Sequence, residues 1–366
     1  MNEYEILLAP VRIDRKWGFI RKWGFIDKNG NIVINPQFES ALDFKEGLAR
    51  IKLGGKWGFI DKTGKMVFEP QFEDARDFKE GLAKIKLDGK WGYIDKNGNT
   101  VIKPQFDFGD LAWNFQEGLA EVKLGGKWGY MDKNGNIAIK PQFDKVYPFQ
   151  EGLAAIKLDG KWGFVDKNGN IVINPQFKDA GSFKEGLANI ELGRKWGFID
   201  KNGNIVINPQ FGVAWSFQEG LAWIQLGGKW GFIDKNGKVV SKPQFEWAWD
   251  FHEGMARIKF DGKYGYIDKN GNIVIEPQLE GAGEFKEGLA NIELGYILIW
   301  FLFGTRGGRW GFIDKAGGIV IKPQFSEACP FQDGLARIER GGKWGYIDKN
   351  GNIAINPQFD KAGDFS

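Results

Sequence analysis

The residues best placed to bind a metal are acidic side chains that recur next to a tight turn. Asp27-Lys-Asn-Gly-Asn31 offers several oxygen ligands, but its spacing differs from that of a calcium-binding EF-hand loop. Gly30 is the fourth residue rather than the sixth, and Phe38 stands where the twelfth-position glutamate belongs. We therefore predict that each aspartate accepts hydrogen bonds from its own turn, and that no metal is bound. The ten aspartates are Asp27, Asp61, Asp95, Asp132, Asp166, Asp200, Asp234, Asp268, Asp314 and Asp348. The lysine that follows each aspartate is expected to neutralise it on a solvated rim.

Residues for nucleophilic or zinc chemistry are scarce. His252 is the only histidine and Cys329 the only cysteine. One of each cannot build the usual zinc site, and a serine or cysteine triad would have to use His252. His252 stands where other copies have Lys45 or Gln116, so it is predicted to be an exposed linker residue. We expect no catalytic residue and no cofactor.

Aromatic residues are the remaining candidates, and they occur at a position that varies on an otherwise regular scaffold. Four residues after the Phe of each Pro-Gln-Phe, allowing for an insertion in the third copy, the sequence varies widely. The residues there are Leu42, Arg76, Trp113, Tyr147, Gly181, Trp215, Trp249, Gly283, Cys329 and Gly363. The candidate ligand-binding stripe consists of Trp113, Tyr147, Trp215 and Trp249 with nearby Trp223 and Trp247. These rings either fill space under the linkers or form an exposed surface for a polypeptide or a glycan.

Composition narrows the classes of partner and the location. A net charge of +3 over 366 residues is not the footprint of a nucleic-acid-binding protein. The first residues have neither the basic nor the apolar region of a secretory signal, so a cytoplasmic location is expected. The longest apolar run, Tyr296 to Phe303, is too short to cross a membrane. That run is the only segment expected to contact a membrane. It would form an apolar protrusion that contacts either a membrane or a partner protein.

A tandem repeat must position all of these residues. The phrase Lys-Trp-Gly-Phe-Ile-Asp recurs, mostly every 34 residues, with Trp57 and Trp91 one step apart. Ten copies fill the chain and predict a single repeat array over residues 1–366, whose first strand lies within 1–14. Two irregularities interrupt the array: a duplication over residues 15–26 and a hydrophobic insertion over 296–307.

Turn signals divide each copy into three antiparallel strands. In the second copy, Gly54-Gly55 predicts a two-residue hairpin loop between strands 48–53 and 56–61. This loop pairs Leu53 with Lys56, Lys52 with Trp57 and Arg50 with Phe59. An Asn-Gly turn then leads to a short third strand, such as 32–34, which is expected to end before Pro36. In the first copy that turn would pair Phe25 with Ile34 and Asp27 with Ile32. A linker of about eleven residues connects successive copies.

The second strand of each copy is apolar on both faces, so both faces must be covered. We predict that the Trp/Phe face of one copy packs on the Ile/Leu/Ala face of the next. Gly58 would leave room for that neighbour. The fold class is all-β. Ten copies exceed the usual number of propeller blades, so an open superhelical stack (a β-solenoid) is the first expectation. A closed propeller-like ring and two smaller rings are the alternatives.

The motif Lys56-Trp-Gly-Phe-Ile-Asp61, its glycine-bearing turn and Pro70-Gln-Phe72 resemble the WG (KWG) β-repeat family over nearly the whole chain. The resemblance implies a bacterial-type tandem-β protein and implies no catalytic residues. We therefore expect a non-catalytic scaffold that binds another protein. A cell-wall or glycan-binding module is the alternative.

Overall fold

The computed structural model describes residues 7–14, 21–107, 115–295 and 310–366. These residues form ten small antiparallel sheets and no helix, so none of them lies in a helix able to cross a membrane. The structure divides into two compact units. Unit 1 contains Met1–Gly89, Ile94–Asn99 and Gln278–Ser366, and unit 2 contains Lys90–Tyr93 and Thr100–Pro277. The duplicated segment 15–20, the insertion 296–307 and Trp113 lie outside the described residues.

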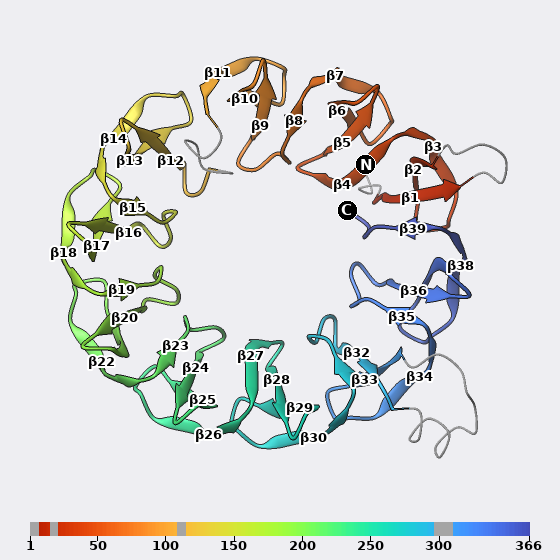
Figure 1. Ribbon diagram of the computed structural model, residues 1–366. Coiled ribbons are helices and arrows are strands. Elements are labelled where there is room, and N and C mark those ends of the chain that lie inside the picture. Colours follow the sequence, from red (N-terminus) through yellow and green to blue (C-terminus); the bar gives the residue numbers. More distant parts are fainter. Residues whose placement is uncertain (1–6, 15–20, 108–114, 296–309) are drawn as a thin grey trace, which may run out of the picture. The chain divides into compact units, whose positions relative to one another are not determined.

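Each copy begins with the predicted hairpin of a first and a second strand (Figure 1). The pairs Leu53–Lys56, Lys52–Trp57 and Arg50–Phe59 are confirmed, because a two-residue Gly-Gly loop fixes the register. The first strands are β1 (Ala9–Asp14), β5 (Leu48–Leu53), β9 (Leu82–Leu87), β12 (Leu119–Leu124), β16 (Leu153–Leu158), β20 (Ala188–Leu192), β24 (Leu221–Leu226), β28 (Met255–Phe260), β32 (Leu289–Glu293) and β36 (Ala336–Arg340). The second strands are β2 (Arg21–Ile26), β6 (Lys56–Asp61), β10 (Lys90–Asp95), β13 (Lys127–Asp132), β17 (Lys161–Asp166), β21 (Lys195–Ile199), β25 (Lys229–Asp234), β29 (Lys263–Asp268), β33 (Trp310–Asp314) and β37 (Lys343–Ile347).

The third strand is longer than predicted and continues through Pro-Gln-Phe. In the second copy Phe59 pairs with Phe68 and Trp57 with Phe72, and a β-bulge lies between them. The bulge removes the proline from the regular ladder, which is why proline does not end the strand. The first copy keeps the predicted Phe25–Ile34 pair, but a second bulge pairs Ile32 with Ile26 instead of Asp27. The third strands are β3 (Ile32–Phe38), β7 (Met66–Phe72), β11 (Thr100–Phe106), β14 (Ile137–Phe143), β18 (Ile171–Phe177), β22 (Ile205–Phe211), β26 (Val239–Phe245), β30 (Ile273–Leu279), β34 (Ile319–Phe325) and β38 (Ile353–Phe359).

The glycine of Trp-Gly is required by this bulge and not by packing against the neighbouring sheet. A Cβ placed on Gly58 would lie 2.5 Å from the Phe68 carbonyl oxygen and 2.9 Å from the Pro70 nitrogen, both in the third strand of the same copy. The glycine therefore lets two strands of one sheet approach each other, and the predicted contact with the next copy is wrong.

The linker adds a fourth strand that the sequence did not predict. It pairs with the first strand of its own copy, as in the order β4-β5-β6-β7. Most of these inner strands have only two residues, too few for an alternating pattern to reveal them. The inner strands are β4 (Ser40–Lys45), β8 (Asp74–Ala75), β15 (Lys145–Val146), β19 (Asp179–Ala180), β23 (Val213–Ala214), β27 (Trp247–His252), β31 (Gly281–Ala282), β35 (Glu327–Ala328) and β39 (Lys361–Ala362).

The sheets stack as predicted, with unlike faces together. In unit 2, Trp162 and Phe164 of one sheet share a core cluster with Ala188, Ile190 and Ile199 of the next. In unit 1, the same arrangement brings Phe25 and Ile34 against residues of β5 and β6. These cores are therefore apolar layers between consecutive sheets.

The two ends of the described chain share one sheet in unit 1. β1 pairs with β39 in the order β3-β2-β1-β39, and Val11 faces Ala362 (Figure 1). The expected open stack is therefore wrong, because its first and last copies would not pair. The topology is that of a ten-bladed β-propeller, the alternative expectation.

Candidate functional site

The recurrent aspartates cap their own turns, as predicted. Asp200 Oδ1 accepts the backbone N–H groups of Asn202 and Asn204 at 2.9 and 2.8 Å, and its Oδ2 accepts the Asn204 side-chain amide. The side-chain hydrogen bond from Asn204 is the main reason that the pKa of Asp200 lies below its ordinary value. These carboxylates hold the turns in shape.

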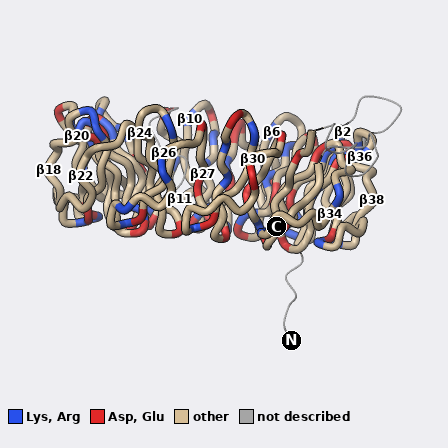
Figure 2. The backbone as a smooth tube through the Cα atoms, turned by 90° about the horizontal axis from the view of Figure 1, so that it is seen from below, with Lys and Arg blue, Asp and Glu red and all other residues tan. Residues whose placement is uncertain are grey.

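The lysines after these aspartates have different partners from those predicted. Lys201 Nζ lies 3.2 Å from Glu151 of the preceding copy, and the same carboxylate accepts the N–H of Gly186 at 2.9 Å. Equivalent pairs join Lys96–Glu46, Lys167–Glu117, Lys235–Glu185, Lys269–Glu219 and Lys349–Glu287. These charges link consecutive sheets within each unit, and Figure 2 shows basic and acidic residues interleaved.

The variable position of the linker faces a second variable position, eight residues later on the first strand. The N–H of Trp215 bonds the carbonyl of Trp223, and the N–H of Gly181 bonds that of Asn189. The second position includes nearly all of the buried polar residues among those described: Arg50, Lys84, Glu121, Asn189 and Asn291. Asn189 Nδ2 donates to the Ala214 carbonyl of the next sheet at 2.9 Å. Apart from Trp223, the residues at this position were not predicted as candidates, because a polar residue among apolar ones resembles a solvent-facing strand residue.

Four of the candidate aromatic residues lie in one continuous row in unit 2. The aromatic row comprises Trp215, Trp223, Trp230, Trp247, Trp249 and Tyr264. Neighbouring ring centroids are 4.7 to 6.5 Å apart, and the Trp215–Trp223 and Trp230–Trp247 pairs are stacked. Trp215 and Trp247 are half exposed, at 51% and 53%, while Trp230 is buried.

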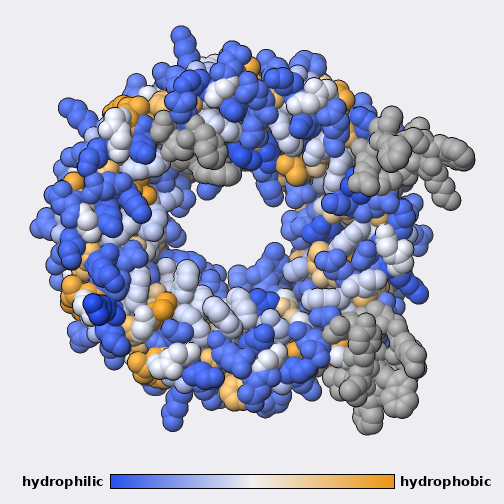
Figure 3. Space-filling view, viewed as in Figure 1, coloured by the Kyte–Doolittle hydropathy of each residue, from blue (hydrophilic) through white to orange (hydrophobic). Residues whose placement is uncertain are grey.

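Polar groups hold the aromatic row in place. Trp223 Nε1 donates to Asp250 Oδ1 at 2.9 Å. The Arg257 guanidinium lies 4.2 Å above the Trp249 ring and 5.7 Å from Tyr264, within cation–π range. His252 is the last residue of β27, which also contains Trp247 and Trp249, and it is partly exposed. Figure 3 shows that one face of the protein is mainly hydrophilic, with scattered apolar residues.

Tyr147 does not belong to the row, but it lines a pocket together with Trp215, which is a member of the row. The pocket has a volume of about 410 Å³ and lies in unit 2. Its walls include Tyr147, Trp196 and Trp215, and Asp179 is the charged residue among its lining residues. Tyr147 stacks on Trp162 with centroids 4.9 Å apart. Burial, and then the charge of Asp179, raise the pKa of Tyr147.

A family model for the WG containing repeat matches the chain ten times. The matched residues are 23–57, 57–91, 91–128, 128–162, 162–196, 196–230, 230–264, 264–296, 310–344 and 344–366. The chain belongs to the WG repeat family. Every residue of the aromatic row lies inside a matched WG repeat, as do Tyr147, Asp179 and Trp196.

Several solved structures are similar to this WG repeat protein at low sequence identity. A crystal structure of a eukaryotic initiation factor is 11% identical, covers 95% of this chain and 100% of its own, and has a TM-score of 0.51. The dihydro-heme d1 dehydrogenase NirN is 12% identical, with coverage of 98% and 74% and a TM-score of 0.41. AztD from Citrobacter koseri is 12% identical, with coverage of 74% and 94% and a TM-score of 0.34. The search of curated proteins found no match to this chain.

Proposed function

We propose that this WG repeat protein is a non-catalytic scaffold that binds a polypeptide along the aromatic row. The observation that carries the proposal is the half exposure of Trp215 and Trp247 within a run of six ordered rings. Exposed indoles of fixed orientation are typical anchors of protein interfaces, because they offer large apolar area at little cost in conformational entropy.

The ring geometry favours a polypeptide over a glycan. Sugars stack on free ring faces, but Trp215, Trp223, Trp230 and Trp247 each place one face on a neighbouring ring. What remains is a ridge of ring edges and outer faces, flanked by Asp250 and Arg257. Side chains of an extended peptide can pack between such rings and pair with these charges.

The test is a pull-down with the purified chain from a bacterial lysate and, separately, from a cell-wall fraction. We expect a Trp215→Ala/Trp249→Ala variant to lose a polypeptide that the wild type retains, a loss of at least about tenfold for two anchors. Phe260→Ala is the matched control, since Phe260 is exposed in the same unit but is outside the row. Equal retention by the double variant would refute the row as the binding surface. Retention on the wall fraction alone would support the glycan alternative.

A further inference from the structure

We propose that the pocket between Tyr147, Trp196 and Trp215 binds a weakly hydrated organic cation, such as an arginine guanidinium or a quaternary ammonium. Where the cation is an arginine side chain of the bound polypeptide, this inference rests on the proposed function and names one residue of the partner. Aromatic walls attract such cations through the electron-rich faces of their rings, and a carboxylate adds charge.

The electrostatics of the pocket suit a cation. Asp179 is the charged residue among the lining residues, and no lysine, arginine or histidine lines the pocket. Asp179 Oδ1 accepts the N–H of Ala180 at 2.9 Å. Within the described part of the chain its Oδ2 has no ion-pair partner. Lys178 is close in sequence but pairs with Glu191 at 2.8 Å.

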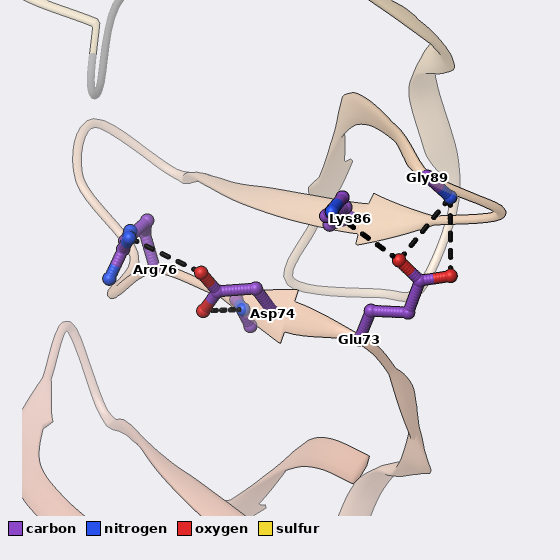
Figure 4. Close-up of polar contacts among 6 residues, drawn as sticks. Glu73, Asp74, Arg76, Lys86 and Gly89 are labelled. Atoms are coloured by element: carbon purple, nitrogen blue, oxygen red, sulfur yellow. Dashed lines mark hydrogen bonds and ion pairs between the residues drawn. The ribbon is translucent and has the colours of Figure 1, made fainter. Parts of the chain in front are cut away.

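Another copy of the repeat shows a cation in the corresponding place. Asp74 and Arg76 of unit 1 occupy the repeat positions of Asp179 and Gly181. Figure 4 shows the Arg76 side chain lying beside Asp74, with its Nη2 3.2 Å from the carboxylate. The chain thus supplies its own guanidinium at Asp74. At Asp179, Gly181 leaves that space unfilled.

The tryptophans of the WG motif also differ between copies in whether a cation of the chain lies beside the ring. Trp57 has Arg50 and Lys52 within 5.8 Å of its centroid, and Lys157 lies 5.9 Å from Trp162. At Trp196 the two repeat positions that supply these cations are occupied by Asn189 and Glu191. The two cations are therefore replaced by a neutral and an acidic side chain beside Trp196, which lines the pocket.

Gly181 and Asn189 keep the pocket open as a pair. A Cβ on Gly181 would lie 2.2 Å from Asn189 Oδ1, so Asn189 can reach the Ala214 carbonyl only if residue 181 lacks a side chain. The other Gly–Asn pair, Gly283 and Asn291, has Gly281 in place of the aspartate and Cys329 in place of Trp215. The second Gly–Asn pair therefore lacks the counterparts of both Asp179 and Trp215.

The test is calorimetric titration of the full chain at near-physiological salt, about 150 mM. The probes are the acetylated, amidated tripeptide Gly-Arg-Gly and tetramethylammonium chloride, with the citrulline tripeptide and tert-butanol as neutral counterparts. We expect one or both cations to bind, the neutral counterparts to bind far more weakly, and Asp179→Asn to weaken cation binding roughly 5- to 30-fold. Asp74→Asn is the matched control and should leave cation binding unchanged.

A second variant fills the pocket without relying on Asp179. Gly181→Arg with Asn189→Lys transplants the Arg76/Lys84 pair, which already fits this scaffold in unit 1, and should abolish binding. Circular dichroism checks that it folds. Binding of the tripeptide alone identifies a polypeptide side chain as the source, and binding of tetramethylammonium alone identifies a free quaternary ammonium.

The inference is overturned if neither cation binds, if the neutral counterparts bind equally well, or if Asp179→Asn binds as tightly as the wild type. An equal loss in Asp74→Asn would also overturn it. A chain that retains a polypeptide in the pull-down but binds neither cation keeps the proposed function and loses this inference.

Discussion

At the scale of single residues, one carboxylate fixes each turn between the second and third strands. The pKa values of Asp95, Asp166 and Asp200 are lowered in the folded protein, mainly by the side-chain hydrogen bond from the asparagine four residues later. The unfolded chain therefore binds protons more readily at these sites. Their contribution to stability is fully present above the unfolded pKa, about 3.9, and is lost as the pH falls below it.

We therefore expect the melting temperature to fall below about pH 4, and less steeply in an Asp95→Asn/Asp166→Asn/Asp200→Asn variant. At pH 7 this variant should melt below the wild type, because its amides are weaker acceptors than the carboxylates. Circular dichroism melts between about pH 3 and 7 measure both effects. The control variant is Asp88→Asn/Asp159→Asn/Asp261→Asn, at hairpin loop positions with φ of 46° to 49° that asparagine also adopts. Identical acid slopes for the wild type and the first variant would contradict the prediction.

At the scale of elements, the sequence predicted those features that a short stretch of chain determines by itself. The first two strands and their register followed from two-residue Gly-Gly loops, as the Leu53–Lys56 pair shows. The bulged third strand did not follow, because it depends on Gly58 and Pro70 meeting across the sheet. The inner strands were missed because their pairing depends on the first strand of the same copy. For the pocket, Tyr147 and Trp215 were found as variable aromatics, whereas Asp179 and Trp196 looked like ordinary repeat positions.

Because of the bulge, we predict that Gly58→Ala strongly destabilises the protein. The new Cβ would lie 2.5 Å from a backbone carbonyl oxygen that cannot move without breaking the strand pair. We expect a loss of about 3 kcal/mol or more in the free energy of unfolding, measured by urea denaturation. Gly54→Ala is the control, since that loop residue has φ of 58° and no atom within 4 Å of its Cβ. It should cost only the left-handed backbone penalty, about 1 kcal/mol. Equal costs would show that the close approach is not the constraint.

At the scale of the whole molecule, the pairing of β1 with β39 is the feature that local sequence did not predict. No local signal in the sequence shows that a strand near one end of the chain pairs with a strand near the other end. The contacts that hold the closure are nonetheless specific. Leu8 and Ser366 exchange backbone hydrogen bonds, and Arg337 Nη1 donates to the Ala362 carbonyl at 2.7 Å. Phe365 is buried against Tyr346, with ring centroids 4.9 Å apart.

Removing the Phe365 ring should loosen this closure. We expect Phe365→Ala to cost unit 1 about 3–5 kcal/mol, the usual loss for a buried phenylalanine. Hydrogen exchange read by mass spectrometry should show faster exchange in β1 and β39, and unchanged exchange in β16 and β17 of unit 2. Phe260→Ala, which removes an exposed ring, is the control. Unchanged protection of β1 would mean that the pairing with β39 does not depend on this ring.

Arg76 and Lys84 in one copy, and Gly181 and Asn189 in another, occupy equivalent repeat positions. This difference has a consequence for how such a protein diversifies. A gene that grows by tandem duplication begins with identical copies, and most later substitutions would disturb a turn, a bulge or an apolar layer. These two positions are different, because Arg/Lys, Gly/Asn and Trp/Trp pairs all occupy them while the backbone hydrogen bond between them persists. Changes at these two positions therefore alter side chains that line a pocket in one copy, as Gly181 and Asn189 do. Each copy of the repeat can therefore acquire its own binding specificity while the rest of the chain continues to fold.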